Sequence, residues 1–286
     1  MLDLACSVGL VLILGLLAAA YAVRVVASGA ASFDRVKRDK GSVLFGARAM
    51  QMGYWGLDPI GRGLAALGVS ANFISATSLV LGLGAAVGIA FGHFGVAAAF
   101  AVVSSLCDAL DGMVARHTKT SSESGEVLDA TIDRYVEFSF LGGLAIHEHD
   151  RPVWLGVALA AILGSFMVSY ATAKAEAMGV EAPRGVMRRP ERAVYLTLGA
   201  ASCPFTALWV ARGGPGWAGE APMIAATILV AVVGNISAVR RLTSIARSLR
   251  GRAAGPTTPL RVPRSAEDGE GPSAEGPNEV RRAANG

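Results

Sequence analysis

The sequence predicts an all-α integral membrane protein, and three observations carry that prediction. Hydrophobic residues make up 52% of the 286 positions, charged residues only 17%, and the mean hydropathy is positive at +0.47. Several apolar runs reach the roughly 20 residues that a helix needs to cross a bilayer. Basic residues gather in alternate connections between these runs. This composition excludes an ordinary soluble domain, and the many glycines suit close packing of membrane helices.

The first predicted span covers residues 4–27, and we treat residues 1–28 as an extra N-terminal transmembrane helix. A secreted signal peptide is the alternative, but such peptides begin with basic residues and this chain begins with an acid, Asp3. A basic cluster from Arg24 to Arg48 follows the span. Because positive charge is enriched in cytoplasmic loops, the helix is expected to end in the cytoplasm and to begin outside.

Residues 29–69 are predicted to form a basic linker and an interfacial amphipathic segment. Apolar and charged residues alternate irregularly over 44–68, and Pro59 with several glycines argues against a continuous spanning helix. Tyr54 and Trp55 suit the headgroup level of a bilayer. A plain linker next to the membrane is an equally open alternative.

Residues 70–250 are predicted to form the main membrane domain. Its six expected spans lie near 71–92, 95–116, 127–147, 152–175, 193–211 and 219–243. The 116–126 connection carries Arg116 and Lys119, and the 174–192 connection and the end of the last span are rich in arginine, so all three are expected in the cytoplasm. A count of seven spans that starts outside gives the same result. Residues 251–286, rich in Pro, Gly, Ser and Glu, are predicted to be a disordered cytoplasmic tail.

Four aspartates lie at the edges of two neighbouring apolar segments. Asp108 and Asp111 share one helix face, and so do Asp129 and Asp133, so two helix ends joined by a short loop can direct all four into one pocket. Carboxylates are preferred ligands of Mg²⁺, Mn²⁺ and Ca²⁺, and four of them could bridge two ions for displacement at phosphorus. The residues predict metal-dependent phosphoryl chemistry at the cytoplasmic surface. A buried polar network or the ion path of a carrier is the alternative.

The complete pattern Asp-x-x-Asp-Gly-x-x-Ala-Arg-x8-Gly-x3-Asp-x3-Asp resembles the signature of the CDP-alcohol phosphatidyltransferase family. Its fixed positions are Asp108, Asp111, Gly112, Ala115, Arg116, Gly125, Asp129 and Asp133. The resemblance covers about residues 44–248 and implies the six-helix bundle of this family, preceded by an interfacial helix. It also implies that a phosphatidyl group passes from CDP-diacylglycerol to the hydroxyl of a small alcohol, with release of CMP.

The resemblance further implies roles for single residues. The metal ligands, for two Mg²⁺ or Mn²⁺ ions, would be Asp108, Asp111, Asp129 and Asp133. Asp133 would also be the general base that takes the proton from the acceptor hydroxyl. The residues lining the CDP-lipid site would be Gly112, Ala115, Arg116, Gly125, Ser122 and Asn72. Ser122 matches a hydroxyl position near the diphosphate in some members. Asn72 matches a Pro-Asn-x-x-Thr element in which Ala71 and Ser75 replace Pro and Thr, and a helix N-cap is the alternative role for Asn72.

Cations within residues 170–192 predict an anionic acceptor, although ordinary positive-inside charge would also explain them. The stretch is similar to the Tyr-x-Lys-Ala-Arg-Ala-Glu and Gly-x-x-x-Arg-x-(Glu/Asp)-Arg elements of phosphatidylinositol phosphate synthases, whose cations bind the phosphate of inositol phosphate. Lys174 stands at the Arg position, Arg189 and Arg192 match, and Thr172 replaces the family's Lys. We therefore expect Lys174, Arg189 and Arg192 to bind the acceptor, with inositol phosphate favoured and glycerol 3-phosphate next.

The leading interpretation is a transferase of phospholipid biosynthesis, multi-pass in a bacterial inner membrane, with its active site on the cytoplasmic side. Family resemblance and the small-residue-rich spans favour a homodimer. Membrane lipids are expected partners, and nucleic acid is not. Two interpretations of another class stay open: a non-catalytic carrier, and a scaffold that assembles partners through the first helix and the tail.

Overall fold

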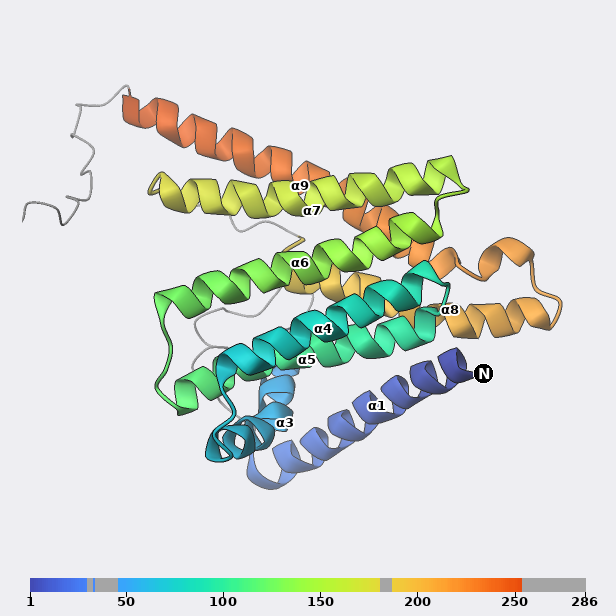
Figure 1. Cartoon of the computed structure of the whole chain (residues 1–286), viewed down its shortest axis with the longest axis horizontal. Coiled ribbons are helices and arrows are strands. Elements are labelled where there is room, and N and C mark those ends of the chain that lie inside the picture. Colours follow the sequence, from blue (N-terminus) through green and yellow to red (C-terminus); the bar gives the residue numbers. More distant parts are fainter. Residues whose placement is uncertain (30–32, 34–45, 181–186, 254–286) are drawn as a thin grey trace, which may run out of the picture. The chain divides into compact units, whose positions relative to one another are not determined.

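The fold is helical, as the sequence predicts. The computed structural model describes residues 1–29, 33, 46–180 and 187–253, and all regular structure within them is α- or 3₁₀-helix (Figure 1). The chain divides into two compact units, Met1–Ser248 and Leu249–Gly286, and the first contains every helix apart from the end of the last one. The elements are α1 (Leu2–Ser28), α3 (Ala47–Ala66), α4 (Ala71–Ala90), α5 (Phe94–His117), α6 (Glu123–His147), α7 (Pro152–Ala177), α8 (Arg189–Ala211), η1 (Gly216–Ala218) and α9 (Ala221–Ala253).

A helix covers each of the seven predicted spans. In the described part of the chain, α1, α4, α5, α7, α8 and α9 are long and apolar enough to cross a membrane. Helix α6 has 25 residues but falls outside that group, because Asp129, Asp133, Arg134 and Glu137 interrupt its apolar sequence. The predicted tail from residue 251 overlaps the last turn of α9, and its remainder lies outside the described residues.

Local sequence signals set where the helices begin. The Ser70 hydroxyl accepts a hydrogen bond from the Phe73 N–H and caps α4, and the Ser122 hydroxyl does the same for the Gly125 N–H at the start of α6. Pro152 begins α7, where its missing N–H costs no hydrogen bond. The turn between α4 and α5 uses Gly92 at φ 77°, a left-handed conformation that favours glycine. These caps and the Gly92 turn mark where the helices begin and end, and the connections between α4, α5 and α6 are short.

Helix α3 is the helix that the family resemblance implied before the membrane domain. It is helical throughout, Pro59 included, although the sequence argued against a continuous spanning helix here. Leu57 and Leu64 on one face pack against Leu110 and Met113 of α5, and this tertiary contact supports a helix whose own propensity is poor. Since α3 is not among the helices apolar enough to span, its interfacial position stays a prediction.

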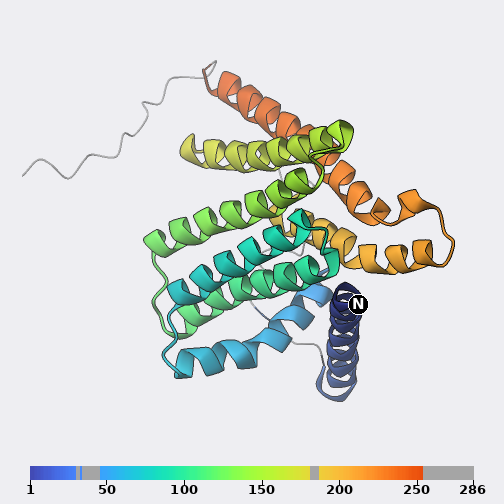
Figure 2. The same cartoon turned by 45° about the vertical axis from the view of Figure 1, so that its right-hand side comes forward.

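Helices α4, α5 and α6 lie side by side in both views (Figures 1 and 2). Small residues permit this approach: a Cβ added to Gly143 of α6 would stand 2.3 Å from the Ala86 carbonyl oxygen of α4. At Gly82 of α4 an added Cβ would stand 2.8 Å from a Val136 methyl group of α6. Helices α7 and α9 also lie together, joined by the Asn235 side-chain amide, which donates to the Ala160 carbonyl at 2.8 Å. The small-residue packing expected of membrane helices is therefore present.

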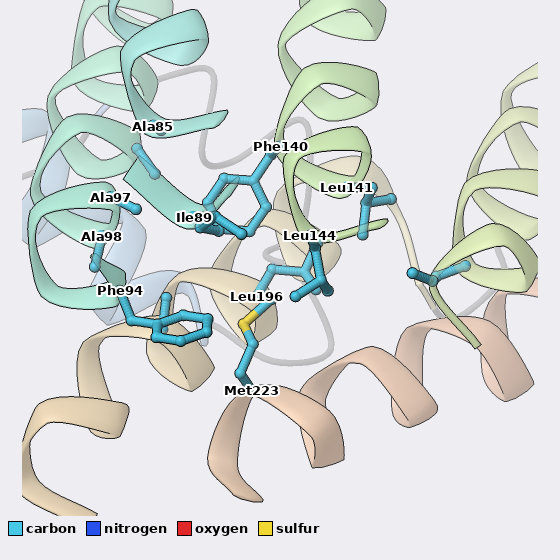
Figure 3. Close-up of a cluster of buried hydrophobic side chains, with 14 of the residues drawn as sticks. Ala85, Ile89, Phe94, Ala97, Ala98, Phe140, Leu141, Leu144, Leu196 and Met223 are labelled. Atoms are coloured by element: carbon cyan, nitrogen blue, oxygen red, sulfur yellow. The ribbon is translucent and has the colours of Figure 1, made fainter. Parts of the chain in front are cut away.

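The larger hydrophobic cluster of the described residues joins six helices, α4 to α9 (Figure 3). Ile89, Phe140, Leu141, Leu196 and Met223 are central to it and come from α4, α6, α8 and α9. Helix α5 contributes alanines near its start. Because these residues belong to the last turns of α4 and α6 and the first turns of α5 and α9, the core holds together the end of the bundle away from the four aspartates.

Helix α1 is attached to the bundle near both of its ends. The Asp3 carboxylate accepts hydrogen bonds from the N–H groups of Gly95 (2.9 Å) and Val96 (3.1 Å) at the start of α5, where a helix favours negative charge. At the other end, the rings of Tyr21 and Trp55 lie 5.5 Å apart, and the Arg24 guanidinium stands over Trp55. The extra helix is therefore docked on α5 and α3.

Candidate active site

The structure brings the predicted carboxylates together. Asp108 and Asp111 lie in the last turns of α5, and Asp129 and Asp133 in the first turns of α6, so the short α5–α6 turn folds the two pairs toward each other. One oxygen from each of Asp108, Asp111 and Asp129 lies within 4.8 Å of the others. Asp133 joins the group through Arg189, whose Nη1 contacts both Asp133 and Asp108.

A serine holds the most buried of these acids. Asp111 is 5% exposed, and its Oδ2 accepts a hydrogen bond of 2.5 Å from the Ser75 hydroxyl of α4. Ser75 occupies the Thr position of the Pro-Asn-x-x-Thr element, and its hydroxyl group is the signal that sequence reasoning passed over. Asn72 lies exposed in the first turn of α4, and the capping role belongs to Ser70, so the N-cap alternative for Asn72 is wrong. Its predicted contact with the CDP-lipid stays a prediction.

The residues present fit divalent metal ions. Asp133 Oδ1 is buried and has no hydrogen-bond partner among the described residues, although buried carboxylate oxygens are normally satisfied. Four carboxylates gather here, and Arg189 contacts two of them, Asp108 and Asp133. Because uncompensated charge is costly where water is scarce, a hard cation with oxygen ligands would stabilise this group.

Two arginines of the first turn of α8 meet α6 in different ways. Arg189 reaches Asp133 and, at 3.4 Å, Asp108, with 29% of its side chain exposed. Arg192 is 1% exposed and donates to both Glu137 oxygens, at 2.5 and 2.8 Å, and to the Met187 carbonyl at 2.7 Å. Arg192 is thus engaged by the protein itself in this structure, and its predicted contact with the acceptor stays a prediction.

Other predicted site residues border the same region. Gly112 and Ala115 are partly exposed on α5, while Arg116 and Lys174 are exposed at helix ends. Ser122 caps α6, as described above, and its hydroxyl also hydrogen-bonds the Ser124 hydroxyl at 3.2 Å. Their roles toward the CDP-lipid and the acceptor remain predictions. Residues 181–186, in the predicted acceptor region, lie outside the described residues.

Arg241 is a candidate site residue that sequence reasoning missed. It is 7% exposed on α9, its Nη1 donates to the Thr172 hydroxyl at 2.8 Å, and its Nε has no hydrogen-bond partner among the described residues. Arg188, Arg192 and the buried acid Glu191 are the charged groups of the described residues close enough to act on it. The sequence showed Arg241 only as one of several basic residues after the last span. Its contact with Thr172, the position of the family's Lys, could not be inferred without the fold.

A second charged cluster lies at the other end of α6. The His147 imidazole contacts Glu220 at 2.9 Å, and Arg151 bridges Glu220 and Glu148 at 2.7 Å each. The hydrogen bond with His147 lowers the pKa of Glu220 to about 2, and Arg151 adds to the effect. Burial raises the pKa of Glu148. The charges of Glu148 and Glu220 are balanced by Arg151 and His147. We interpret this cluster as a structural link between the α6–α7 turn and the start of α9.

Comparisons with known proteins agree with the aspartate motif. A phosphatidylinositol phosphate synthase of Mycobacterium tuberculosis is 34% identical over 156 residues, which is 51% of this chain and 70% of the relative. An archaetidylinositol phosphate synthase of Methanothermobacter thermautotrophicus is 28% identical over 194 residues, 68% of this chain and 90% of the relative. A bifunctional IPC transferase and DIPP synthase of Thermococcus kodakarensis is 47% identical over 70 residues, and the chain spans only 16% of that relative.

Solved structures show the same likeness. The Mycobacterium tuberculosis phosphatidylinositol phosphate synthase with CDP-DAG bound matches with a TM-score of 0.57 and 28% identity, covering 66% of this chain and 92% of that one. The same enzyme in complex with manganese and citrate matches with a TM-score of 0.58 and covers 88% of that chain. The family pattern for CDP-alcohol phosphatidyltransferases matches residues 68–233, more than half of the sequence. The chain therefore belongs to the CDP-alcohol phosphatidyltransferase family.

Proposed function

We propose that the protein transfers the phosphatidyl group of CDP-diacylglycerol to the hydroxyl of an anionic alcohol and releases CMP. The observation that carries this proposal is the convergence of the motif carboxylates, with Asp108, Asp111 and Asp129 oxygens within 4.8 Å of one another. Solved relatives have been seen with CDP-DAG and with manganese. These ligands match what the four acids are suited to bind.

The side chains divide the chemistry among them. Asp108, Asp111, Asp129 and Asp133 would hold Mg²⁺ or Mn²⁺, which when bound would offset the charge of the diphosphate. Asp133 is also the proposed general base, whose carboxylate would accept the proton of the acceptor hydroxyl. The acceptor oxygen forms a bond to the phosphatidyl phosphorus, and the bond from that phosphorus to the oxygen of CMP breaks.

The acceptor is proposed to carry a phosphate group. Arg241 supports this, because a buried guanidinium with an unpartnered Nε is costly to maintain unless an anion completes its contacts. Lys174 and Arg189 are the proposed further contacts. Inositol phosphate is the favoured acceptor, since relatives from bacteria and archaea are named for inositol phosphate products. Glycerol 3-phosphate is the alternative, because Thr172 removes one cation of the inositol phosphate pattern.

The cellular placement of the site is part of the proposal. The basic residues near Lys174, Arg189 and Arg241 belong to the same end of the helices as the aspartates. Positive charge favours the cytoplasmic side, so the active site is proposed to face the cytoplasm of a bacterial cell. A homodimer stays a prediction.

A CMP-release assay with purified protein tests the acceptor. CDP-diacylglycerol is supplied with one acceptor at a time: inositol phosphate, glycerol 3-phosphate, free inositol or serine. We expect CMP to be released only with the phosphorylated acceptors. Arg241→Gln is expected to raise the KM for that acceptor by about tenfold, the value of one charge-assisted hydrogen bond. Arg240→Gln, an exposed neighbour, is the matched control. Equal rates with free and phosphorylated alcohols would contradict the assignment.

A further inference from the structure

Two acid–arginine pairs join α6 to the first turn of α8. Arg189 contacts Asp133, and Arg192, three residues further along α8, contacts Glu137, four residues further along α6. Residues three or four apart lie on the same helix face, so the two pairs follow each other along one seam. Asp133 is a proposed metal ligand, whereas Glu137 lies one helical turn beyond it.

The Arg192–Glu137 pair is buried and fully hydrogen-bonded. Arg192 is 1% exposed and makes three hydrogen bonds, two to the Glu137 carboxylate and one to the Met187 carbonyl. The Arg188 N–H donates to Glu191 at 3.0 Å and closes the start of α8. Breaking a buried, fully hydrogen-bonded ion pair on one side is strongly unfavourable. The backbone of Arg189, between these anchors, is therefore held in place.

The contacts of Arg189 with Asp133 and Asp108 are more exposed than the Arg192–Glu137 pair. The exposed fractions are 29% for the Arg189 side chain, 15% for Asp133 and 28% for Asp108, so water and ions can reach this pair. The carboxylates that Arg189 touches are the same ones that fit a divalent metal. A guanidinium and a metal ion cannot both occupy the same oxygens of Asp133 and Asp108 without repulsion.

We propose that Arg189 is an internal counter-ion that exchanges with the metal, so that metal binding releases its guanidinium to bind the phosphate of the acceptor. The inference rests on the proposed function, because it uses the proposed metal site and an anionic acceptor. Its consequence is positive coupling between metal and anion. Metal held by the oxygens that Arg189 contacts would require the guanidinium to leave Asp108 and Asp133, and an anion that binds the released guanidinium would offset that cost.

Equilibrium linkage makes this coupling measurable from either side. If an anion raises the affinity for metal by some factor, the metal raises the affinity for the anion by the same factor. Couplings between sites in proteins usually amount to about 5- to 150-fold. We expect about tenfold, because the Arg189 contacts are partly exposed to solvent.

The experiment uses the full chain in detergent micelles without CDP-lipid. Mn²⁺ is titrated and free Mn²⁺ is followed by electron paramagnetic resonance, with and without inorganic phosphate. In the wild type we expect phosphate to tighten Mn²⁺ binding about tenfold, and Mn²⁺ to tighten phosphate binding equally in calorimetry. Arg189→Gln is expected to bind Mn²⁺ about tenfold more tightly without phosphate and to lose the coupling. Arg240→Gln changes charge equally and is expected to behave as wild type.

The outcomes separate the inference from the function beneath it. Unchanged phosphate coupling in Arg189→Gln would overturn the inference, because phosphate would then be acting directly on the metal. Equal Mn²⁺ affinities of Arg189→Gln and wild type would overturn it too, while leaving the metal site intact. Absence of Mn²⁺ binding by the wild type would overturn the proposed metal site together with the inference. Phosphate that leaves the Mn²⁺ affinity of the wild type unchanged would also overturn the inference, and this measurement needs no variant.

Discussion

Removing one partner of the Arg192–Glu137 pair should strongly destabilise the protein. In Arg192→Leu, the Glu137 carboxylate, whose side chain is 11% exposed, loses both hydrogen bonds that Arg192 donates to it. Breaking a buried pair in this way costs about 3–5 kcal/mol. For a chain of this size each kcal/mol lowers the Tm by about 2–4 °C, so a fall of roughly 6–20 °C is expected.

The stability of the double variant Arg192→Leu/Glu137→Leu, compared with that of Arg192→Leu, shows whether the loss comes from leaving Glu137 buried and unpaired. Replacing both members with apolar residues removes the unpaired charge, so stability should return to within about 1 kcal/mol of wild type or above it. Thermal unfolding in detergent, followed by tryptophan fluorescence, measures all four proteins of the cycle. A loss under about 1 kcal/mol in Arg192→Leu, the range of exposed ion pairs, would refute the assignment of Arg192 as the anchor of α8.

Two further predictions concern packing and pH. Gly143→Ala should cost about 1–3 kcal/mol of stability, because its Cβ would stand 2.3 Å from the Ala86 carbonyl oxygen, whereas the adjacent Gly142→Ala meets nothing within 4 Å and should be neutral or stabilising in thermal unfolding. The folded-state pKa of Glu220 is lowered from 4.5 to about 2 by its hydrogen bond with His147, so its contribution to stability is present above pH 4.5 and is lost as the pH falls toward 2. In acid titrations of thermal stability, Glu220→Gln should lose less stability than wild type over that interval, and parallel curves would contradict this.

Helix positions were predictable because long apolar runs leave few alternatives. Each predicted span became a helix, and Ser122 and Pro152 mark beginnings that local chemistry explains. Helix α3 was predicted from the family resemblance more than from its own residues, since Pro59 and the glycines argue against a continuous spanning helix. The packing of Leu57 and Leu64 on α5, which supports the helix, depends on residues distant in sequence.

The acids of the site were predictable for a related reason. Within one motif, the spacing puts Asp108 and Asp111 on one face of α5 and Asp129 and Asp133 on one face of α6, and a short turn joins the two helices. The arginines near the acids come from helices far apart in sequence, so residue spacing cannot predict which side chains they contact. Arg192 was expected to bind the acceptor, a role that stays a prediction, and the structure places it against Glu137. Arg241 looked like ordinary positive charge after the last span but is buried beside Thr172.

The most direct test of the central claim is CMP release from CDP-diacylglycerol by the purified wild type and by Asp133→Asn, each with and without Mn²⁺. We predict release by the wild type that requires both the metal and a phosphorylated acceptor. Release by Asp133→Asn should fall by at least about 100-fold, because Asn cannot accept the proton of the acceptor hydroxyl. Undiminished release by Asp133→Asn, or release by the wild type after the metal has been chelated, would contradict the account.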